Sequence, residues 1–189
     1  MPLAPWRSPL AHALHRNRSL PNSRYAQLAT VRSDGFPANR TIVVRGFLPG
    51  GNQLRFVTDG RSEKVGQGDR AELCWYFPKT REQFRIRGRL RFVDGGSGDE
   101  GLLKARRMLW HELSDGARLS FLWPEPGMGR SAPEAFVIEP PDNMIPAEDF
   151  CLLLMEPIYV DHLELRGEPQ NRSIYRLEDG EWEMGDVNP

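Results

Sequence analysis

Two short stretches of the chain carry the polar side chains with the clearest chemical use. The first, RTIVVR at residues 40–45, places an arginine at each end of an apolar strand. Residues five apart in a strand point to opposite faces, so both guanidiniums reach one ligand only if the strand wraps around it. The second, VTDGRSEK at residues 57–64, combines the hydroxyls of Thr58 and Ser62 with the Lys64 ammonium where a strand leads into a helix. Such donors together bind an anion.

Each stretch also has a plain structural interpretation. The two arginines of residues 40–45 fit the solvated ends of a strand, and residues 57–64 fit a capped helix in a connecting loop. Gln83 opens a third stretch, QFRIRGRLRF at residues 83–92. Its amide offers a donor and an acceptor, as the edge of a heterocycle such as an isoalloxazine requires.

Residues 83–92 alternate between polar and apolar side chains, which predicts a strand with one face in a core. The opposite face carries four arginines, at positions 85, 87, 89 and 91. A groove for single-stranded nucleic acid is one interpretation of that face. The formal net charge of −1 and the pI near 6.4 count against it and against an anionic membrane surface.

Several site classes are excluded by missing motifs. The chain has no GxSxG, HExxH, GxGxxG, Walker or CxxC pattern, which leaves no basis for a serine hydrolase, a metal site, a dinucleotide fold or an NTPase. Cys74 and Cys151 lie in apolar runs, where thiols are buried and unreactive. No signal peptide or 18-residue apolar stretch occurs, so we expect a cytoplasmic protein without a membrane partner.

The elements that must position these residues are mostly strands. Residues 71–77 (AELCWYF) are nearly continuously apolar, which predicts a strand buried on both faces. Ser114 is placed to cap a short helix. Helices are expected over 9–18 and 62–67 and as two segments within 98–123; strands are expected over 25–32, 39–47, 53–58, 71–77, 83–92, 136–138, 150–155, 159–166, 172–177 and around Trp182.

This order of short strands with a few helices favours one domain over residues 1–189, a small antiparallel β-barrel with helical additions. Residues 1–22 form an N-terminal helix or arm. Residues 124–149 contain many prolines and form the Pro-rich excursion, a surface segment.

Taken in order, four motifs resemble the FMN-binding split-barrel family of pyridoxamine 5′-phosphate oxidase over roughly residues 24–93. They are R-x-x-x-x-R, then V-T-D-G-R-S-E-K-V-G-Q, then W-Y-F, then R-E-Q-F-R-I-R-G. Arg118 before the WPEPG segment at 123–127 is similar to a divergent branch of probable FMN-dependent enzymes. The resemblance implies a mainly β (α+β) fold, an antiparallel split β-barrel with flanking helices. It also implies a homodimer with FMN at the subunit interface.

The resemblance further implies roles for individual residues. Arg40, Ser62 and Lys64 would bind the FMN phosphate, and Arg45 and Gln83 would hydrogen-bond the flavin ring. Trp123 and Arg172 would come from the partner subunit. The complete implied cofactor-binding set is Arg40, Thr41, Val43, Val44, Arg45, Val57, Thr58, Ser62, Lys64, Gln83, Arg118, Trp123 and Arg172.

The implied activity is hydride transfer from a small-molecule substrate to flavin N5, with no side chain identified as a catalytic base. Two departures from the family pattern matter. Glu63 stands where the family has a phosphate-binding arginine, and Arg61 is the nearest candidate to replace it. Leu163 stands in place of the family's tryptophan, and Pro169-Gln170-Asn171-Arg172 stands in place of its Arg-x-His-Asp-Arg, of which the substrate-binding first arginine and histidine are lost and only the last arginine is kept. A non-catalytic flavin or tetrapyrrole carrier is the alternative function.

Overall fold

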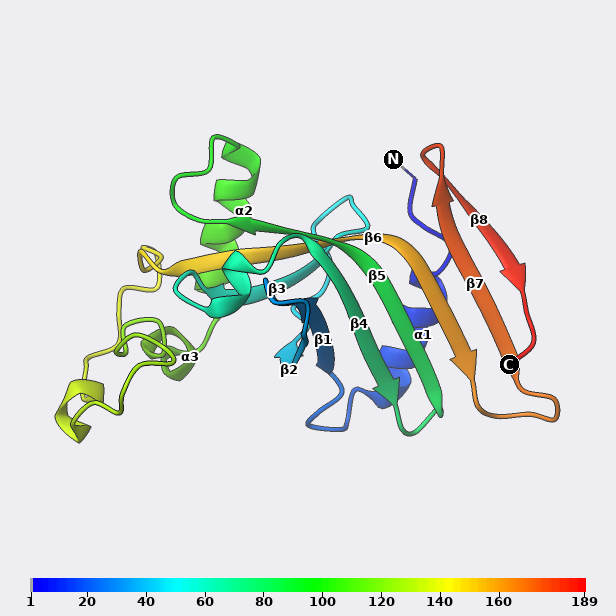
Figure 1. Ribbon diagram of the computed structural model, residues 1–189, viewed down its shortest axis with the longest axis horizontal. Coiled ribbons are helices and arrows are strands. Elements are labelled where there is room, and N and C mark those ends of the chain that lie inside the picture. The colour runs from blue at the N-terminus through cyan, green and yellow to red at the C-terminus, as the bar shows by residue number, and fades with distance from the viewer. Residues whose placement is uncertain (1) are drawn as a thin grey trace. The chain divides into compact units, whose positions relative to one another are not determined.

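The computed structural model describes residues 2–189, and antiparallel strands dominate it (Figure 1). The helical elements are α1 (Arg7–Asn17), η1 (Glu63–Gly66), α2 (Glu100–His111), α3 (Asp115–Leu119) and η2 (Pro133–Phe136). The strands are β1 (Tyr25–Val31), β2 (Pro37–Val43), β3 (Leu54–Asp59), β4 (Arg70–Phe77), β5 (Glu82–Val93), β6 (Phe150–Glu164), β7 (Asn171–Glu178) and β8 (Glu181–Asp186).

The strands form one eight-stranded sheet with the hydrogen-bonded order β2-β1-β4-β5-β6-β7-β8, and β3 pairs with β6. The pairs β1–β2, β1–β4, β4–β5, β6–β7 and β7–β8 are antiparallel. Within residues 2–189 the end strands β2 and β8 do not pair with each other, so the sheet stays open. The predicted mainly β (α+β) class, an antiparallel split β-barrel fold with flanking helices, is confirmed, but the strands do not close into the small barrel expected from the strand pattern.

The chain divides into two compact units. Unit 1 comprises Met1–Phe56, Gln67–Arg91 and Met155–Pro189, and unit 2 comprises Val57–Gly66 and Phe92–Leu154. The single-domain organisation, with an arm over 1–22 and the excursion over 124–149, stays a prediction. No helix within residues 2–189 has the length and apolar character needed to span a membrane.

Unit 1 has its core on the inner face of the sheet. Trp6, at the start of α1, is fully buried, and its ring lies 5.9 Å from that of Phe47 and 5.8 Å from that of Trp182. The Trp75 indole donates to the carbonyl of Ser23 over 3.0 Å. These long-range contacts anchor the N-terminal helix, because buried aromatic surface strongly stabilises packing.

Unit 2 has a smaller core of three aromatic rings. Trp110, Phe121 and Phe150 pack edge-to-face at centroid distances of 5.0 to 5.8 Å. The Arg106 side chain donates to the carbonyls of Phe150 and Ala147. The Ser114 hydroxyl accepts from Ala117 N at the start of α3, as its predicted cap requires.

Some predicted elements were wrong. Residues 136–138 form no strand, because the proline-rich context yields only the 3-10 turn η2. The strands expected over 150–155 and 159–166 are one strand, β6, because extended backbone continues through Pro157 even though that nitrogen cannot donate a hydrogen bond.

Strand β4 is not buried on both faces as predicted. Trp75 and Phe77 are buried, whereas Tyr76 between them is 44% exposed. An antiparallel sheet with one covered face produces this alternation. The alternation predicted for β5 holds through Leu90 and then fails, since Val93 rather than Phe92 is buried. Gly88 occupies an inward position of β5, where a Cβ would lie 2.3 Å from the carbonyl oxygen of Glu156.

Candidate functional site

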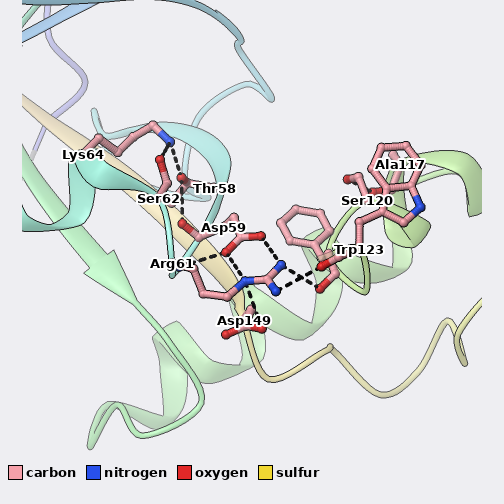
Figure 2. Close-up of polar contacts among 10 residues, drawn as sticks. Thr58, Asp59, Arg61, Ser62, Lys64, Ala117, Ser120, Trp123 and Asp149 are labelled. Carbon is pink, nitrogen blue, oxygen red and sulfur yellow. Dashed lines mark hydrogen bonds and ion pairs between the residues drawn. The ribbon is translucent and has the colours of Figure 1, made fainter. Parts of the chain in front are cut away.

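One ammonium and two hydroxyls form a cluster at the end of strand β3 and in the turn after it, in unit 2. Lys64 Nζ lies 2.7 Å from both Thr58 Oγ1 and Ser62 Oγ (Figure 2). The turn that brings them together is closed by Ser62 N donating to the carbonyl of Asp59. Thr58 is buried, and Ser62 and Lys64 are partly exposed. This is a compact, cationic, donor-rich group of the kind that binds phosphate.

Arg61 lies beside this cluster in sequence, and its guanidinium turns away from Lys64 (Figure 2). Its Nε and Nη2 donate to the two oxygens of Asp59 over 2.9 and 2.7 Å. The hydrogen bonds to Asp59 raise the pKa of Arg61. Burial raises the pKa of Asp59, but the hydrogen bonds and charge of Arg61 outweigh it, so that pKa lies below its usual value.

The other predicted residues of unit 2 have different surroundings. Val57 precedes Thr58 in β3 and is half-buried. Arg118 is buried, and its side chain donates to the carbonyls of Trp110 and Leu113 and to Asp115. Trp123 is 39% exposed and packs edge-on against Phe136. The Arg118 side chain is thus hydrogen-bonded to neighbouring residues of its own segment, whereas part of the Trp123 ring is exposed.

In unit 1, Arg40 is held by three neighbours. Its Nη1 donates to Thr30 Oγ1 over 2.6 Å and to the carbonyl of Leu28, and its Nη2 donates to Gln67 Oε1 over 3.2 Å. Thr30 also donates to Gln67 Oε1. The Gln67 Nε2 atom is buried without a hydrogen-bond partner within the described residues. Gln67 therefore adds a buried donor beside Arg40, which is consistent with an anion site.

The predicted site residues among 41–45 lie in the last part of β2 and directly after its end at Val43. Thr41 and Val43 pair with residues of β1, and Val44 is buried. The backbone N–H groups of Val44 and Arg45 donate to the carbonyls of Arg24 and Arg55, both over 2.8 Å. The predicted strand over 39–47 thus ends at Val43, and these two amides are already bonded within unit 1.

Arg172 belongs to a second polar group of unit 1, and Gln83 lies on the strand that carries another member, Arg85. Gln83 and Arg85 share one face of β5, since they are two residues apart. Arg85 Nη2 and Arg172 Nη2 both donate to Asp161 Oδ2, over 2.7 and 2.8 Å, and Arg172 Nε donates to Asp161 Oδ1. Burial raises the pKa of Asp161, but the hydrogen bonds and charges of the two arginines lower it by more than burial raises it. The pKa of Asp161 therefore lies below its usual value.

Two further arginines of the β5 face, Arg87 and Arg89, are paired with acidic or aromatic side chains. Arg87 Nε lies 3.2 Å from Glu72 Oε2, and the Arg87 guanidinium carbon lies 4.3 Å from the centre of the Tyr159 ring. Arg89 Nη1 lies 2.6 Å from Asp69 Oδ2. Pairing with carboxylates reduces the positive potential of the face. This pairing argues against a groove for nucleic acid.

A third polar group of unit 1 was not predicted. His162 Nε2 lies 2.9 Å from Glu82 Oε2, with Glu164 nearby, and the imidazole stacks on Phe84 at 4.1 Å. Burial raises the pKa of Glu82, but hydrogen bonds from His162 and Thr80 reverse this, and the pKa is below its usual value. The partners of this pair are 80 residues apart, so no local pattern could reveal it.

The structure brings only some of the predicted residues together. Thr58, Ser62 and Lys64 meet in unit 2. Arg40, Thr41 and Val43 lie in β2, and Val44 and Arg45 come directly after it. Arg172 is bonded to Asp161, and Gln83 lies on the face of β5 that carries Arg85. Val57, Arg118 and Trp123 do not join these groups. Sequence reasoning missed Gln67 and Asp161 as partners of predicted residues. Gln67 is the last residue of the motif V-T-D-G-R-S-E-K-V-G-Q, and its place in that motif was the only sequence feature that could have indicated Gln67 as a site residue.

Comparisons with known proteins are consistent across the chain. Residues 3–94 match the family model described as the FMN-binding domain of pyridoxamine 5′-phosphate oxidase. The chain is 37% identical over 170 residues to pyridoxine/pyridoxamine 5′-phosphate oxidase 2 of Arabidopsis thaliana, covering 87% of this chain and 85% of that protein.

Solved structures agree. A pyridoxamine 5′-phosphate oxidase-related, FMN-binding protein of Nostoc punctiforme is 56% identical, with a TM-score of 0.96 over 100% of both chains. PhzG of Burkholderia lata, solved with tetrahydrophenazine-1-carboxylic acid, has a TM-score of 0.77 over 100% of this chain and 94% of its own. At 19% identity, the latter match concerns the fold alone.

Proposed function

Because the chain belongs to the FMN-binding pyridoxamine 5′-phosphate oxidase family, we propose that it is an FMN-dependent oxidoreductase acting on pyridoxamine or pyridoxine 5′-phosphate. The family and FMN as its cofactor are established by the matches, as the sequence predicted. The reaction and substrate are proposed because the Arabidopsis relative bears that activity in its name and matches over most of both chains.

The observation that carries the proposal is the Thr58–Ser62–Lys64 cluster. An ammonium within 2.7 Å of two hydroxyls offers a positive charge and rotatable O–H donors, which is the donor set that a phosphate monoester requires. Arg40 adds a guanidinium fixed by Thr30 and Gln67. The cluster fits the phosphate of FMN, and we assign it to that phosphate; Arg40 is assigned to the phosphate from the family pattern.

The flavin ring is assigned to the residues with planar or amide donors. Arg45 and Gln83 would hydrogen-bond its polar edge, with Thr41, Val43, Val44 and Val57 lining it. Arg172, fixed by Asp161, would add positive charge near the ring. Trp123 would contribute its exposed ring surface. We assign Arg118 to holding its own segment, because its donors meet backbone carbonyls.

When bound, FMN would accept from the substrate one hydride, which carries two electrons, and would later pass these two electrons to dioxygen, which with two protons becomes hydrogen peroxide. The task of the protein is to orient the substrate and to exclude water. We further propose a homodimer with FMN at the subunit interface, and a cytoplasmic location.

The first test is the visible absorbance of freshly purified protein, with identification of the released chromophore. Flavin bands with FMN released on denaturation are expected. Turnover of pyridoxine 5′-phosphate with stoichiometric hydrogen peroxide supports the oxidase reaction. A flavin-loaded protein without that turnover rejects the substrate and favours the carrier function. Light scattering at the size-exclusion peak tests the dimer.

A further inference from the structure

Arg61 occupies the centre of a hydrogen-bonded network in unit 2. Its Nε and Nη2 hold both oxygens of Asp59, its Nη1 donates to the carbonyl of Trp123 over 3.0 Å, and its Nη2 also reaches the carbonyl of Phe121 (Figure 2). Its Nε lies 3.2 Å from Asp149 Oδ2. A guanidinium has five N–H donors in a fixed plane, so these partners define its orientation closely.

These partners lie at the two ends of the Pro-rich excursion, residues 124–149. Phe121 and Trp123 lie just before it, and Asp149 is its last residue. The backbone N–H of Gly60 also donates to the carbonyl of Asp149 over 2.7 Å. A Cβ on Gly60 would lie 3.2 Å from Cys151 Sγ, so this close approach favours glycine. The segment that carries Thr58, Ser62 and Lys64 is therefore hydrogen-bonded to the residues at both ends of the excursion.

The same network makes Arg61 a poor phosphate ligand. Two carboxylates already surround its guanidinium, and a phosphate dianion placed there would face like charges. The Lys64 ammonium donates to two hydroxyl oxygens, and these hydroxyls can redirect their own protons toward an anion.

We infer that Arg61 is a positioning residue that fastens both ends of the Pro-rich excursion to the Thr58–Lys64 segment, and that it does not replace the phosphate-binding arginine whose place Glu63 occupies. The inference rests on the proposed function for its link to flavin binding. Arg61 holds Trp123 and the excursion in place, while the Lys64 ammonium compensates phosphate charge.

The test compares the affinities of FMN and riboflavin, which lacks the phosphate, for apo-protein. Losing one charge-assisted phosphate contact in Lys64→Met lowers FMN affinity about tenfold and leaves riboflavin affinity unchanged. Arg61→Gln instead weakens both flavins by a similar factor, so the ratio of the two affinities stays within about twofold of wild type. Arg61→Lys keeps the charge but cannot span the acceptors, and shifts both affinities in the same direction as Arg61→Gln.

A second readout needs no flavin. Arg130 is exposed within the excursion, and tryptic cleavage after it reports local opening. Arg61→Gln accelerates this cleavage about tenfold, as expected when a charge-assisted bond holding a segment is lost, whereas Lys64→Met leaves it unchanged. Asp149→Asn accelerates it too, and the double variant gives less than the product of the single effects, because the two residues share one contact.

Two outcomes would overturn the inference: a loss of FMN affinity alone in Arg61→Gln, or unchanged cleavage after Arg130. Wild-type protein that binds neither flavin defeats the proposed function instead, while the cleavage assay still decides whether Arg61 fastens the excursion. If Arg61→Gln does not fold, Asp149→Asn replaces it; unchanged cleavage in that variant contradicts the inference.

Discussion

Two ion-pair groups of the described residues differ in the charge at their centre. In unit 1, one buried carboxylate, Asp161, is shared by Arg85 and Arg172, and Arg85 also lies 3.8 Å from Glu72. In unit 2, one guanidinium, Arg61, is shared by Asp59 and Asp149. The first group is centred on a carboxylate and the second on a guanidinium. The presence of an arginine therefore does not by itself identify an anion site; the carboxylates around it decide.

The groups also differ in what holds them. The backbone ladder of β6 and β7 places Asp161 and Arg172 on neighbouring strands before any side chain interacts. The Arg61 group joins a turn to the two ends of a long excursion, and its side chains themselves hold the backbone in place. We expect the first group to depend on strand packing and the second on individual hydrogen bonds.

The largest effect is expected from disturbing the strand packing of unit 1. A methyl group in Gly88→Ala would lie 2.3 Å from the Glu156 carbonyl oxygen, and backbone cannot yield as a flexible side chain does. We expect a loss of about 3 kcal/mol in the free energy of unfolding. Urea unfolding of apo-protein measures it. Gly116→Ala in α3 meets open space and serves as control, with a change of less than about 1 kcal/mol.

Removing the shared carboxylate of unit 1 is the next largest change. Asp161→Asn removes the counter-charge of Arg172 and the closer of two counter-charges of Arg85, whose Nε still lies 3.8 Å from Glu72 Oε1. Complete burial of a broken pair costs about 3–5 kcal/mol, but the side chains of Arg85 and Arg172 are 38% and 30% exposed. Solvation then lowers the cost to about 2 kcal/mol. An equal stability of variant and wild type at pH 7 would contradict this prediction.

The pH dependence gives an independent check on Asp161. Its pKa is lower in the folded protein than in the unfolded chain. The charge contribution is therefore complete above the unfolded pKa of about 3.9 and is lost as the pH falls through the folded value. The stability difference between wild type and Asp161→Asn should be constant from pH 7 to 5 and shrink under stronger acid.

A smaller change in the free energy of unfolding is expected for a buried arginine of unit 2, Arg118. Arg118→Met keeps most of the apolar stem but leaves the carbonyls of Trp110 and Leu113 without this donor. We expect a loss of about 1.5 kcal/mol in unfolding free energy, in line with buried groups that lose a hydrogen bond. The ratio of FMN to riboflavin affinity should stay at its wild-type value. A selective loss of FMN affinity would instead place Arg118 at the phosphate.

The local sequence determined those features that depend on near neighbours. The alternation of residues 83–90 fixed which side chains of β5 face the core, because successive strand residues point to opposite faces. Ser114 predicted the start of α3, because a serine hydroxyl can cap a helix. The order of four motifs indicated the family and its cofactor FMN. The order Thr58, Ser62, Lys64 also brought three donors together, because a turn after a strand spans only a few residues.

Only the tertiary structure decided what each polar side chain meets. Arg61 reaches a carbonyl 62 residues away, Arg40 a glutamine 27 away and Arg85 an aspartate 76 away. Such pairs have no period or spacing, because they form where strands and loops distant in sequence are packed together. Arg61 and Lys64 are both cations near the same turn in the sequence. The carboxylates that the fold brings to Arg61, and the hydroxyls beside Lys64, give them different roles.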